Sequence, residues 1–226
     1  MTPGPRSNHL RPPRAVDIAV PVNGLSRAKT RLQAPPEVRR RLVIAFLTDT
    51  LHAALECTSV RTVTVITDDA AVQRAARSAG AVTFAPHLPR PGLNRDITAF
   101  ARASIDDHPI AVIPADLPAV TASALTVALA ECAAHDIAFV RDQQDTGTTL
   151  LYSRRASALH PAFGMRSADR HQSAGAQPLT RVDPGLRRDV DTLSDLRAAQ
   201  SLGVGASTWA AINAHIEVLS PSLHRQ

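Results

Sequence analysis

The chain of 226 residues is long enough to bury a sizeable hydrophobic core as one α/β domain. Its formal net charge is +5, but Arg6, Arg11 and Arg14 lie in a segment without acidic residues, so the rest of the chain is nearly neutral. Because only 3% of the residues are aromatic and no basic stripe appears, the composition argues against nucleic acid as a partner.

The cysteines and the apolar runs exclude further classes of protein. Cys57 and Cys132 lie far apart and form no Cys-x-x-Cys pair or Cys/His cluster, which argues against zinc and indicates reduced core cysteines. No run approaches the roughly 18 apolar residues of a membrane span, and the N-terminus lacks the apolar region of a secretory signal. We therefore expect a cytoplasmic protein that has no membrane partner.

The first 14 residues differ in composition from the rest of the chain. They contain four prolines and few apolar side chains, so little burial would offset the entropy lost on ordering them. We predict a disordered tail over residues 1–14 and one folded domain over residues 15–226.

From residue 16 onward, short β-branched runs alternate with longer stretches of helical period. Strands are predicted over 16–22, 61–67, 81–84, 110–114, 137–141 and 148–152. Helices are predicted over 35–55, 69–79, 94–105, 121–134, 167–175, 194–202 and 207–218. This order predicts a mainly parallel sheet covered by helices on both faces, in which ligands bind beyond the carboxyl ends of the strands.

The basic residues comprise 24 arginines and a single lysine, Lys29, which follows the first predicted strand. A lysine ammonium is a compact point charge that binds phosphate oxygens differently from a planar guanidinium. The position of Lys29 therefore predicts a phosphate ligand, with an ordinary surface lysine as the alternative.

Three aspartates could bind a metal ion. Asp116 follows the apolar run 110–114, and Asp189 and Asp191 stand two residues apart, so an extended backbone would point both to one face. Magnesium is commonly held by one or two carboxylates together with substrate phosphates, so Asp116 and one of the other two would suffice. Alternatively, Asp116 starts a turn, and one of the other two caps the helix predicted near residue 194, or both pair with Arg187 and Arg188.

Two loops have the composition of an anion site. Residues 145–149 combine hydroxyl side chains, including Thr148, with a glycine that allows close approach. Gly164 precedes Ser167, which is a predicted N-cap, and the free N–H groups of the following helix could bind a phosphate or a carboxylate. Arg170 and His171 could extend that site, although an ordinary helix cap is the alternative. Neither a phosphate-loop motif nor a dinucleotide-binding fingerprint is present.

Several segments together resemble the guanylyltransferases of coenzyme F(420) biosynthesis, which are nucleotidyltransferases of the GT-A-like, Rossmann-related class. The resemblance extends over about residues 15–205, and the combination of motifs is more specific than any single one. It implies an α/β fold with one GT-A-like domain, whose mainly parallel mixed sheet is covered by helices. The matching segments are 20–22, 28–32, 92–94, 115–118, 146–150, 163–171 and 185–192.

The resemblance implies that GMP moves from GTP onto a three-carbon phospho-acid, phosphoenolpyruvate or 2-phospho-L-lactate, with release of pyrophosphate. The composition favours phosphoenolpyruvate. Magnesium would be the cofactor, and the product could pass to the next transferase of the pathway. By motif, Asp116 and Asp189, with Asp191 as the alternative, would hold the magnesium, and Lys29 would contact the triphosphate.

The remaining site residues follow from the same resemblance. Thr148, Gly164 and Ser167 would bind the phospho-acid, and Arg31 and Asn94 are assigned to nucleotide binding. One departure is that Asn23 stands where the family usually has a second lysine. This departure leaves open that the chain is a catalytically inert nucleotide-binding or partner-binding protein. Another nucleotidyltransferase of the same fold, for a sugar phosphate or molybdopterin, is a separate alternative.

Overall fold

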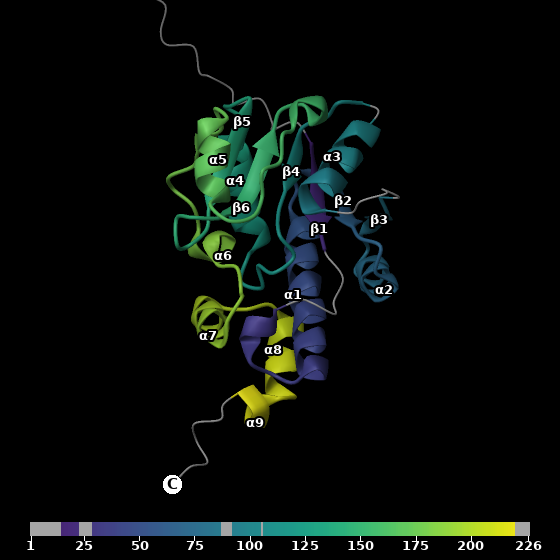
Figure 1. Cartoon of the computed structure of the whole chain (residues 1–226), viewed down its shortest axis with the longest axis vertical. Coiled ribbons are helices and arrows are strands. Elements are labelled where there is room, and N and C mark those ends of the chain that lie inside the picture. The colour runs from purple at the N-terminus through teal and green to yellow at the C-terminus, as the bar shows by residue number, and fades with distance from the viewer. Residues whose placement is uncertain (1–14, 23–28, 87–91, 105, 220–226) are drawn as a thin grey trace, which may run out of the picture.

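The computed structural model describes residues 15–22, 29–86, 92–104 and 106–219. The predicted tail over residues 1–14 and the departure at Asn23 lie outside these residues. Within them, the chain forms one seven-stranded sheet with helices on both of its faces, as shown in Figure 1. The predicted fold class is therefore confirmed.

The sheet is mixed, because one strand runs against its neighbours. β6 is antiparallel to both β4 and β5, whereas the other paired strands are parallel. The short β7 was not predicted, because two residues are too few to show a periodic pattern. In spatial order the strands are β3 (Val82–Phe84), β2 (Val60–Ile66), β1 (Val16–Pro21), β4 (Ile110–Val112), β6 (Thr148–Ser153), β5 (Ile137–Arg141) and β7 (Gln177–Pro178).

The predicted helices all occur, with two differences. The helix predicted over 207–218 is two helices, α8 and α9, and the one-turn α6 was not predicted. α6 begins where the Asp183 carboxylate accepts the N–H of Gly185. The helices are α1 (Pro36–Glu56), α2 (Ala70–Ser78), α3 (Leu93–Ala103), α4 (Ala122–Cys132), α5 (Ser167–Ser173), α6 (Pro184–Arg187), α7 (Leu193–Leu202), α8 (Ala206–Asn213) and α9 (Ile216–Leu219).

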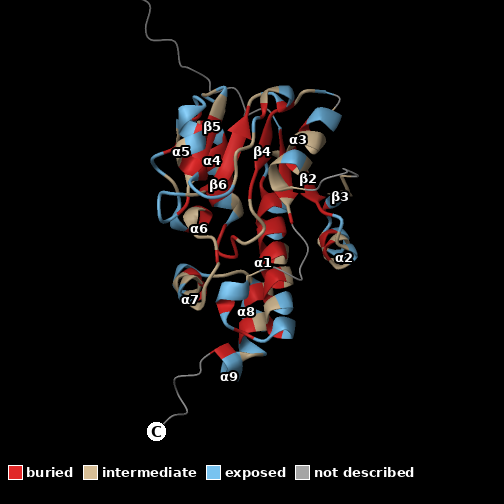
Figure 2. Cartoon of the chain, in the orientation of Figure 1, coloured by how far each residue is buried: buried red, intermediate tan, exposed pale blue. Residues whose placement is uncertain are grey.

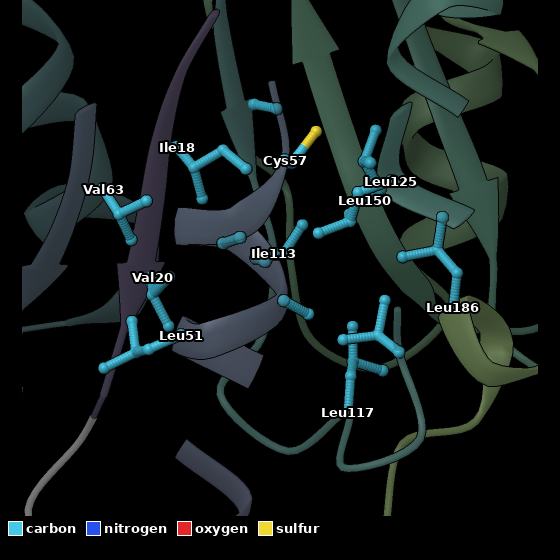
Figure 3. Close-up of a cluster of buried hydrophobic side chains, with 14 of the residues drawn as sticks. Ile18, Val20, Leu51, Cys57, Val63, Ile113, Leu117, Leu125, Leu150 and Leu186 are labelled. Carbon is cyan, nitrogen blue, oxygen red and sulfur yellow. The ribbon is translucent and has the colours of Figure 1, made fainter. Parts of the chain in front are cut away.

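Alternate residues of β1 supply the two faces of the sheet, because successive strand side chains point in opposite directions. Ile18 and Val20 belong to the core that α1, α2, α4 and α6 cover, and Ala19 belongs to the core beneath α3 and α5. Figure 2 shows the buried sheet between these helices. Figure 3 shows the first core, where Leu125 of α4 and Leu186 of α6 lie near the same strands.

A third core joins the first half of α1 to α7, α8 and α9, which lie below the sheet in Figure 1. Within it, the buried carboxylate of Asp49 accepts the backbone N–H groups of Ser207 and Thr208 at 3.0 and 2.8 Å. An acidic group at this position satisfies the unpaired N–H groups at the start of α8 and complements the helix dipole. The C-terminal helices are thereby attached to α1.

The cysteines are both buried and free, as predicted. Burial raises the pKa of the Cys132 thiol well above its usual range, so this sulfur stays protonated. In the part of the chain that the structure describes, no helix combines the length and the apolar character that crossing a membrane requires.

Close packing of α6 leaves no space for a side chain at Gly185. A methyl group on this glycine would overlap the carbonyl oxygen of Ala119, which belongs to the backbone and cannot rotate away. We therefore expect Gly185→Ala to lower the free energy of unfolding by about 3 kcal/mol, measured by urea denaturation. Gly92→Ala is the control, because a methyl group there meets no atom within 4 Å. Equal stability of the two variants would contradict this account.

Candidate functional site

Loops from several strands meet at one edge of the sheet. The carboxyl ends of the parallel strands β1 and β4 lie at this edge, and the antiparallel strand β6 begins there. Lys29 after β1 contacts Asp116 after β4, and Arg187 donates to the carbonyl oxygen of Asp142 after β5 at 2.7 Å. The described residues of the loops after β1, β4 and β5 therefore lie at the carboxyl edge of the sheet, where the sequence predicts that ligands bind.

Lys29 lies between two carboxylates that are distant in sequence. Its ammonium nitrogen donates to Oδ2 of Asp116 and to Oδ1 of Asp191, and its side chain is only 13% exposed. Burial acts against the charge, but Asp116 and Asp191 together raise the pKa of Lys29 above its ordinary value. The alternative of an ordinary surface lysine is therefore wrong.

The backbone of Lys29 is also unusual, with a φ of 55° and a ψ of 41°. Few residues other than glycine, asparagine and aspartate adopt this left-handed conformation, and residues that do are frequent at functional sites. The conformation starts a short 3-10 turn, Thr30–Leu32, in which Leu32 is fully buried. Packing of this turn brings Lys29 to the two aspartates.

Asp116 is held in place through its backbone rather than through its carboxylate. Its carbonyl oxygen accepts the N–H of Val190 at 3.1 Å, and the N–H of Leu117 donates to the hydroxyl of Thr50, on α1, at 3.2 Å. Oδ1 of Asp116 is buried and has no hydrogen-bond partner among the described residues. The carboxylate therefore does not serve the turn, and that alternative is wrong.

The alternatives for Asp189 and Asp191 also fail. The helix after them is capped by Thr192, which forms a reciprocal capping box with Asp195. Arg187 instead binds Asp145 and the carbonyl oxygens of the β5–β6 loop. Asp191 pairs with Lys29, and Asp189 is left as an acidic group beside Asp116.

Asp189 has an unusual protonation equilibrium. Burial is the main cause that raises its pKa to about 7, and the nearby charge of Asp116 raises it further, while Lys29 lowers it. An additional positive charge nearby would stabilise the ionised form of such a carboxyl group. The acidic group is thus suited to a cationic ligand.

Magnesium is the ion that the resemblance implies for this group of residues. Among the described residues, no three His, Cys, Asp or Glu side chains are arranged to hold a metal by themselves. However, Asp116 and Asp191 already share one cation, the Lys29 ammonium, and Oδ1 of Asp116 has a free acceptor site. Two carboxylates that are completed by substrate phosphates form a common magnesium site, so the residues fit.

The second group of candidate residues lies where α5 meets the β5–β6 loop. The N–H of Ala168 donates to the carbonyl oxygen of Thr146 at 3.1 Å, and the N–H of Ser167 donates to that of Gly164 at 3.0 Å. Two of the helix N–H groups that were expected to be free for an anion are therefore occupied. The prediction that Ser167 is the N-cap is also wrong, because Ser167 is the first helical residue.

The reason for this difference is the conformation of the preceding residues. Arg166 is the N-cap in the left-handed conformation with a φ of 55°, and Gly164 has a φ of 112°. With these positive φ angles the chain turns sharply before α5. Of the two residues, only glycine adopts a positive φ readily. The turn leaves Gly164 exposed and buries Ser167.

Thr148 and His171 connect the two segments. The hydroxyl oxygen of Thr148 lies 2.9 Å from Nδ1 of His171, and both residues are buried. Burial, with a smaller contribution from Arg170, lowers the pKa of His171 to about 4, so its ring is neutral at pH 7. The sequence suggested that His171 extends an anion site, but its buried, neutral ring brings no positive charge to an anion.

The two remaining nucleotide-binding candidates are not part of these groups. Arg31 is exposed in the 3-10 turn after Lys29. Asn94 exchanges two hydrogen bonds with the backbone of Phe163, at 3.0 and 2.8 Å, and so ties α3 to the loop before α5. It also lines a surface hollow of about 340 Å³ with Arg95 and Arg102. For both residues, contact with a nucleotide stays a prediction.

Sequence reasoning missed two residues that hold the site together. Thr50 binds the turn after Asp116 from the middle of α1, and Arg187 binds the β5–β6 loop. No local signal marks Thr50, since a buried threonine in a helix is common. Arg187 lies two residues before Asp189, but its sequence context suggested pairing with the adjacent aspartates.

Comparison with known proteins identifies relatives over most of the chain. A family model described as "Guanylyl transferase CofC like" matches residues 16–178. A protein of Geodermatophilus obscurus named phosphoenolpyruvate guanylyltransferase is 45% identical over 206 residues, which cover 88% of this chain and 94% of that protein. A protein of the same name from Streptomyces scabiei is 46% identical over 204 residues, covering 86% of this chain and 94% of that protein.

Solved structures agree on the fold. A candidate nucleotide-diphospho-sugar transferase from Desulfovibrio desulfuricans G20 superposes with a TM-score of 0.71 at 18% identity, covering 92% of this chain and 98% of that one. A nucleotidyl transferase from Methanothermobacter gives a TM-score of 0.55 at 16% identity, covering 83% and 97%. At these identities the likeness concerns the fold alone.

Proposed function

The chain belongs to the family of CofC-like guanylyl transferases, and from this membership we propose that it transfers GMP from GTP to phosphoenolpyruvate and releases pyrophosphate. Family membership makes the chain a nucleotidyltransferase. The names of its relatives support phosphoenolpyruvate as the acceptor. The sequence motifs that resemble coenzyme F(420) enzymes support a place in that pathway.

The observation that carries the proposal is the convergence of Lys29, Asp116 and Asp191 at the carboxyl edge of the sheet. A transferred nucleotide brings several negative charges to this edge. Asp116 together with Asp189 or Asp191 would hold a magnesium ion, which supplies positive charge to the phosphate oxygens. Lys29 offers a second positive charge in the same place.

The proposed step is an in-line displacement at the α-phosphorus of GTP. A phosphate oxygen of phosphoenolpyruvate forms the new P–O bond, and the bond to the bridging oxygen of pyrophosphate breaks. The attacking phosphate is already ionised at neutral pH, so no side chain has to remove a proton. The protein's contribution is to align two anions and offset their repulsion.

Each group of residues has a separate part in that alignment. Lys29 would bind the triphosphate on the side of the leaving pyrophosphate, and the hydroxyls of Thr148 and Ser167 would bind the acceptor. The turn at Gly164 would allow the acceptor to approach the backbone closely. Because Thr148 begins β6 at the carboxyl edge of β4, the two groups of residues lie at one edge of the sheet.

A panel assay tests this function. The protein is incubated with GTP, magnesium and either phosphoenolpyruvate, 2-phospho-L-lactate or a sugar phosphate, and pyrophosphate release is followed together with the guanylylated product. We expect rapid release only with phosphoenolpyruvate. Faster turnover with a sugar phosphate would favour another nucleotidyltransferase, and tight GTP binding without turnover would favour an inert nucleotide-binding protein.

A further inference from the structure

His171, on α5, joins two segments of the site through its two ring nitrogens. Nδ1 lies 2.9 Å from the hydroxyl oxygen of Thr148, and Nε2 accepts the backbone N–H of Ala162 at 3.0 Å. The residue is 1% exposed, and its ring contacts the rings of Phe139 and Phe163 at centroid distances of 6.0 and 5.2 Å. The imidazole is thus held in one orientation, with both of its nitrogens used.

The N–H of Ala162 decides which ring nitrogen carries the proton. A backbone amide nitrogen can only donate, so Nε2 has to present its lone pair. In a neutral imidazole the proton then lies on Nδ1. Nδ1 is therefore the donor in the contact with Thr148, and the threonine oxygen is the acceptor.

This tautomer determines the direction in which the O–H bond of Thr148 points. The hydroxyl has a single proton, and because its oxygen accepts from His171, that proton points away from the ring. Among the described residues, the contact with His171 is the one hydrogen bond that this hydroxyl forms. A hydroxyl that is oriented in this way at the substrate edge is prepared to donate to an anionic oxygen.

We propose that His171 is a positioning residue, which orients the Thr148 hydroxyl as a hydrogen-bond donor to an anionic oxygen of the three-carbon phospho-acid. This inference rests on the proposed function, which assigns the acceptor to Thr148. His171 acts through Thr148 and does not contact the substrate. Its effect should therefore fall on the Michaelis constant (KM) for the acceptor and not on that for GTP.

Two amide substitutions separate this role from a merely structural one. The Nδ2 amide of His171→Asn can replace Nδ1–H as a donor to Thr148, but it leaves Ala162 without an acceptor. The longer side chain of His171→Gln can reach Ala162 with its carbonyl oxygen, but it leaves Thr148 without a donor. We expect the KM for phosphoenolpyruvate to rise about tenfold in His171→Gln and less than about threefold in His171→Asn, with the KM for GTP unchanged in both.

The opposite order, or no change in either variant, would overturn the proposal. If both substitutions raise the KM for the acceptor equally, each is combined with Thr148→Val, a variant that lacks the hydroxyl, to give a double variant. A role through Thr148 predicts that His171→Gln then has no further effect on this KM. If the fold-increases in KM of the two single variants multiply in the double variant, His171 acts independently of Thr148.

A measurement on the wild-type protein needs neither a folded variant nor turnover. Nitrogen-15 NMR of labelled histidine distinguishes the two neutral tautomers, and we expect the ring of His171 to stay neutral between pH 7 and pH 5, because burial lowers its pKa to about 4. Protonated Nδ1 and unprotonated Nε2 are expected, and the reverse tautomer would reject the proposal. If the tautomer is as expected but no GMP reaches any phospho-acid, the proposed function fails instead.

Discussion

Replacing Asp116 with alanine is expected to abolish the release of pyrophosphate from GTP while the protein still folds. The carboxylate binds Lys29 and has a second, buried oxygen without a partner among the described residues, so it is available to a cation. The structural contact of this residue is its carbonyl oxygen, which alanine keeps. We expect kcat/KM to fall by at least about 10²-fold, measured by a coupled pyrophosphate assay.

A matched control for Asp116 is the exposed ion pair of Asp136 with Arg154. The Asp136 side chain is 92% exposed, so Asp136→Ala should change turnover by less than about twofold. Circular dichroism during heating reports whether both variants fold. Turnover like that of the wild type in a folded Asp116→Ala variant would remove this residue from the mechanism, whatever the behaviour of Asp189 and Asp191.

Arginine at position 29 is expected to impair turnover even though it keeps the positive charge. The ammonium of Lys29 fits between two carboxylates and is only 13% exposed, whereas a guanidinium is planar, larger and more weakly hydrated. We expect kcat/KM to fall at least about tenfold in Lys29→Arg and about 10²-fold or more in Lys29→Met. Arg41→Lys is the control, because its side chain is 59% exposed and, within the described part of the chain, its ion pair is with Glu37.

Lys29 also permits a test that does not depend on turnover. Without nucleotide its ammonium lies between Asp116 and Asp191, so it should compete with a divalent cation for these oxygens. Lys29→Met is therefore expected to bind Mn²⁺ more tightly than the wild type does, and Asp116→Ala more weakly, as measured by electron paramagnetic resonance. Equal affinities in the three proteins would show that these oxygens are not the cation site.

Much of the fold could be predicted because its signals are local. The six longer strands and the succession of helices follow from residue periodicity, and a mainly parallel sheet follows from their order. The errors arose where local signals were weak or overruled. The two-residue β7 and the one-turn α6 are too short for periodicity, and the left-handed Arg166 moved the cap of α5 by one residue.

The candidate site was predicted in part, for the same physical reason. A residue just beyond a parallel strand lies at the ligand-binding edge wherever the rest of the chain goes, which made Lys29 and Asp116 recognisable. By contrast, the neutral state of His171 depends on burial between rings from distant segments. The use of Asn94 as a tether to Phe163 depends on α3 lying beside a loop 69 residues away.

The sequence by itself determined the class of fold, the family, and the aspartates and lysine that carry the charge of the site. These features depend on residue type and on short-range order, which a chain possesses before it folds. Only the tertiary structure decided that Lys29 is shared by Asp116 and Asp191, that Thr192 with Asp195 rather than Asp189 or Asp191 caps α7, and that two N–H groups of α5 are occupied. Partners and protonation states depend on distance and burial, which arise when remote segments pack together.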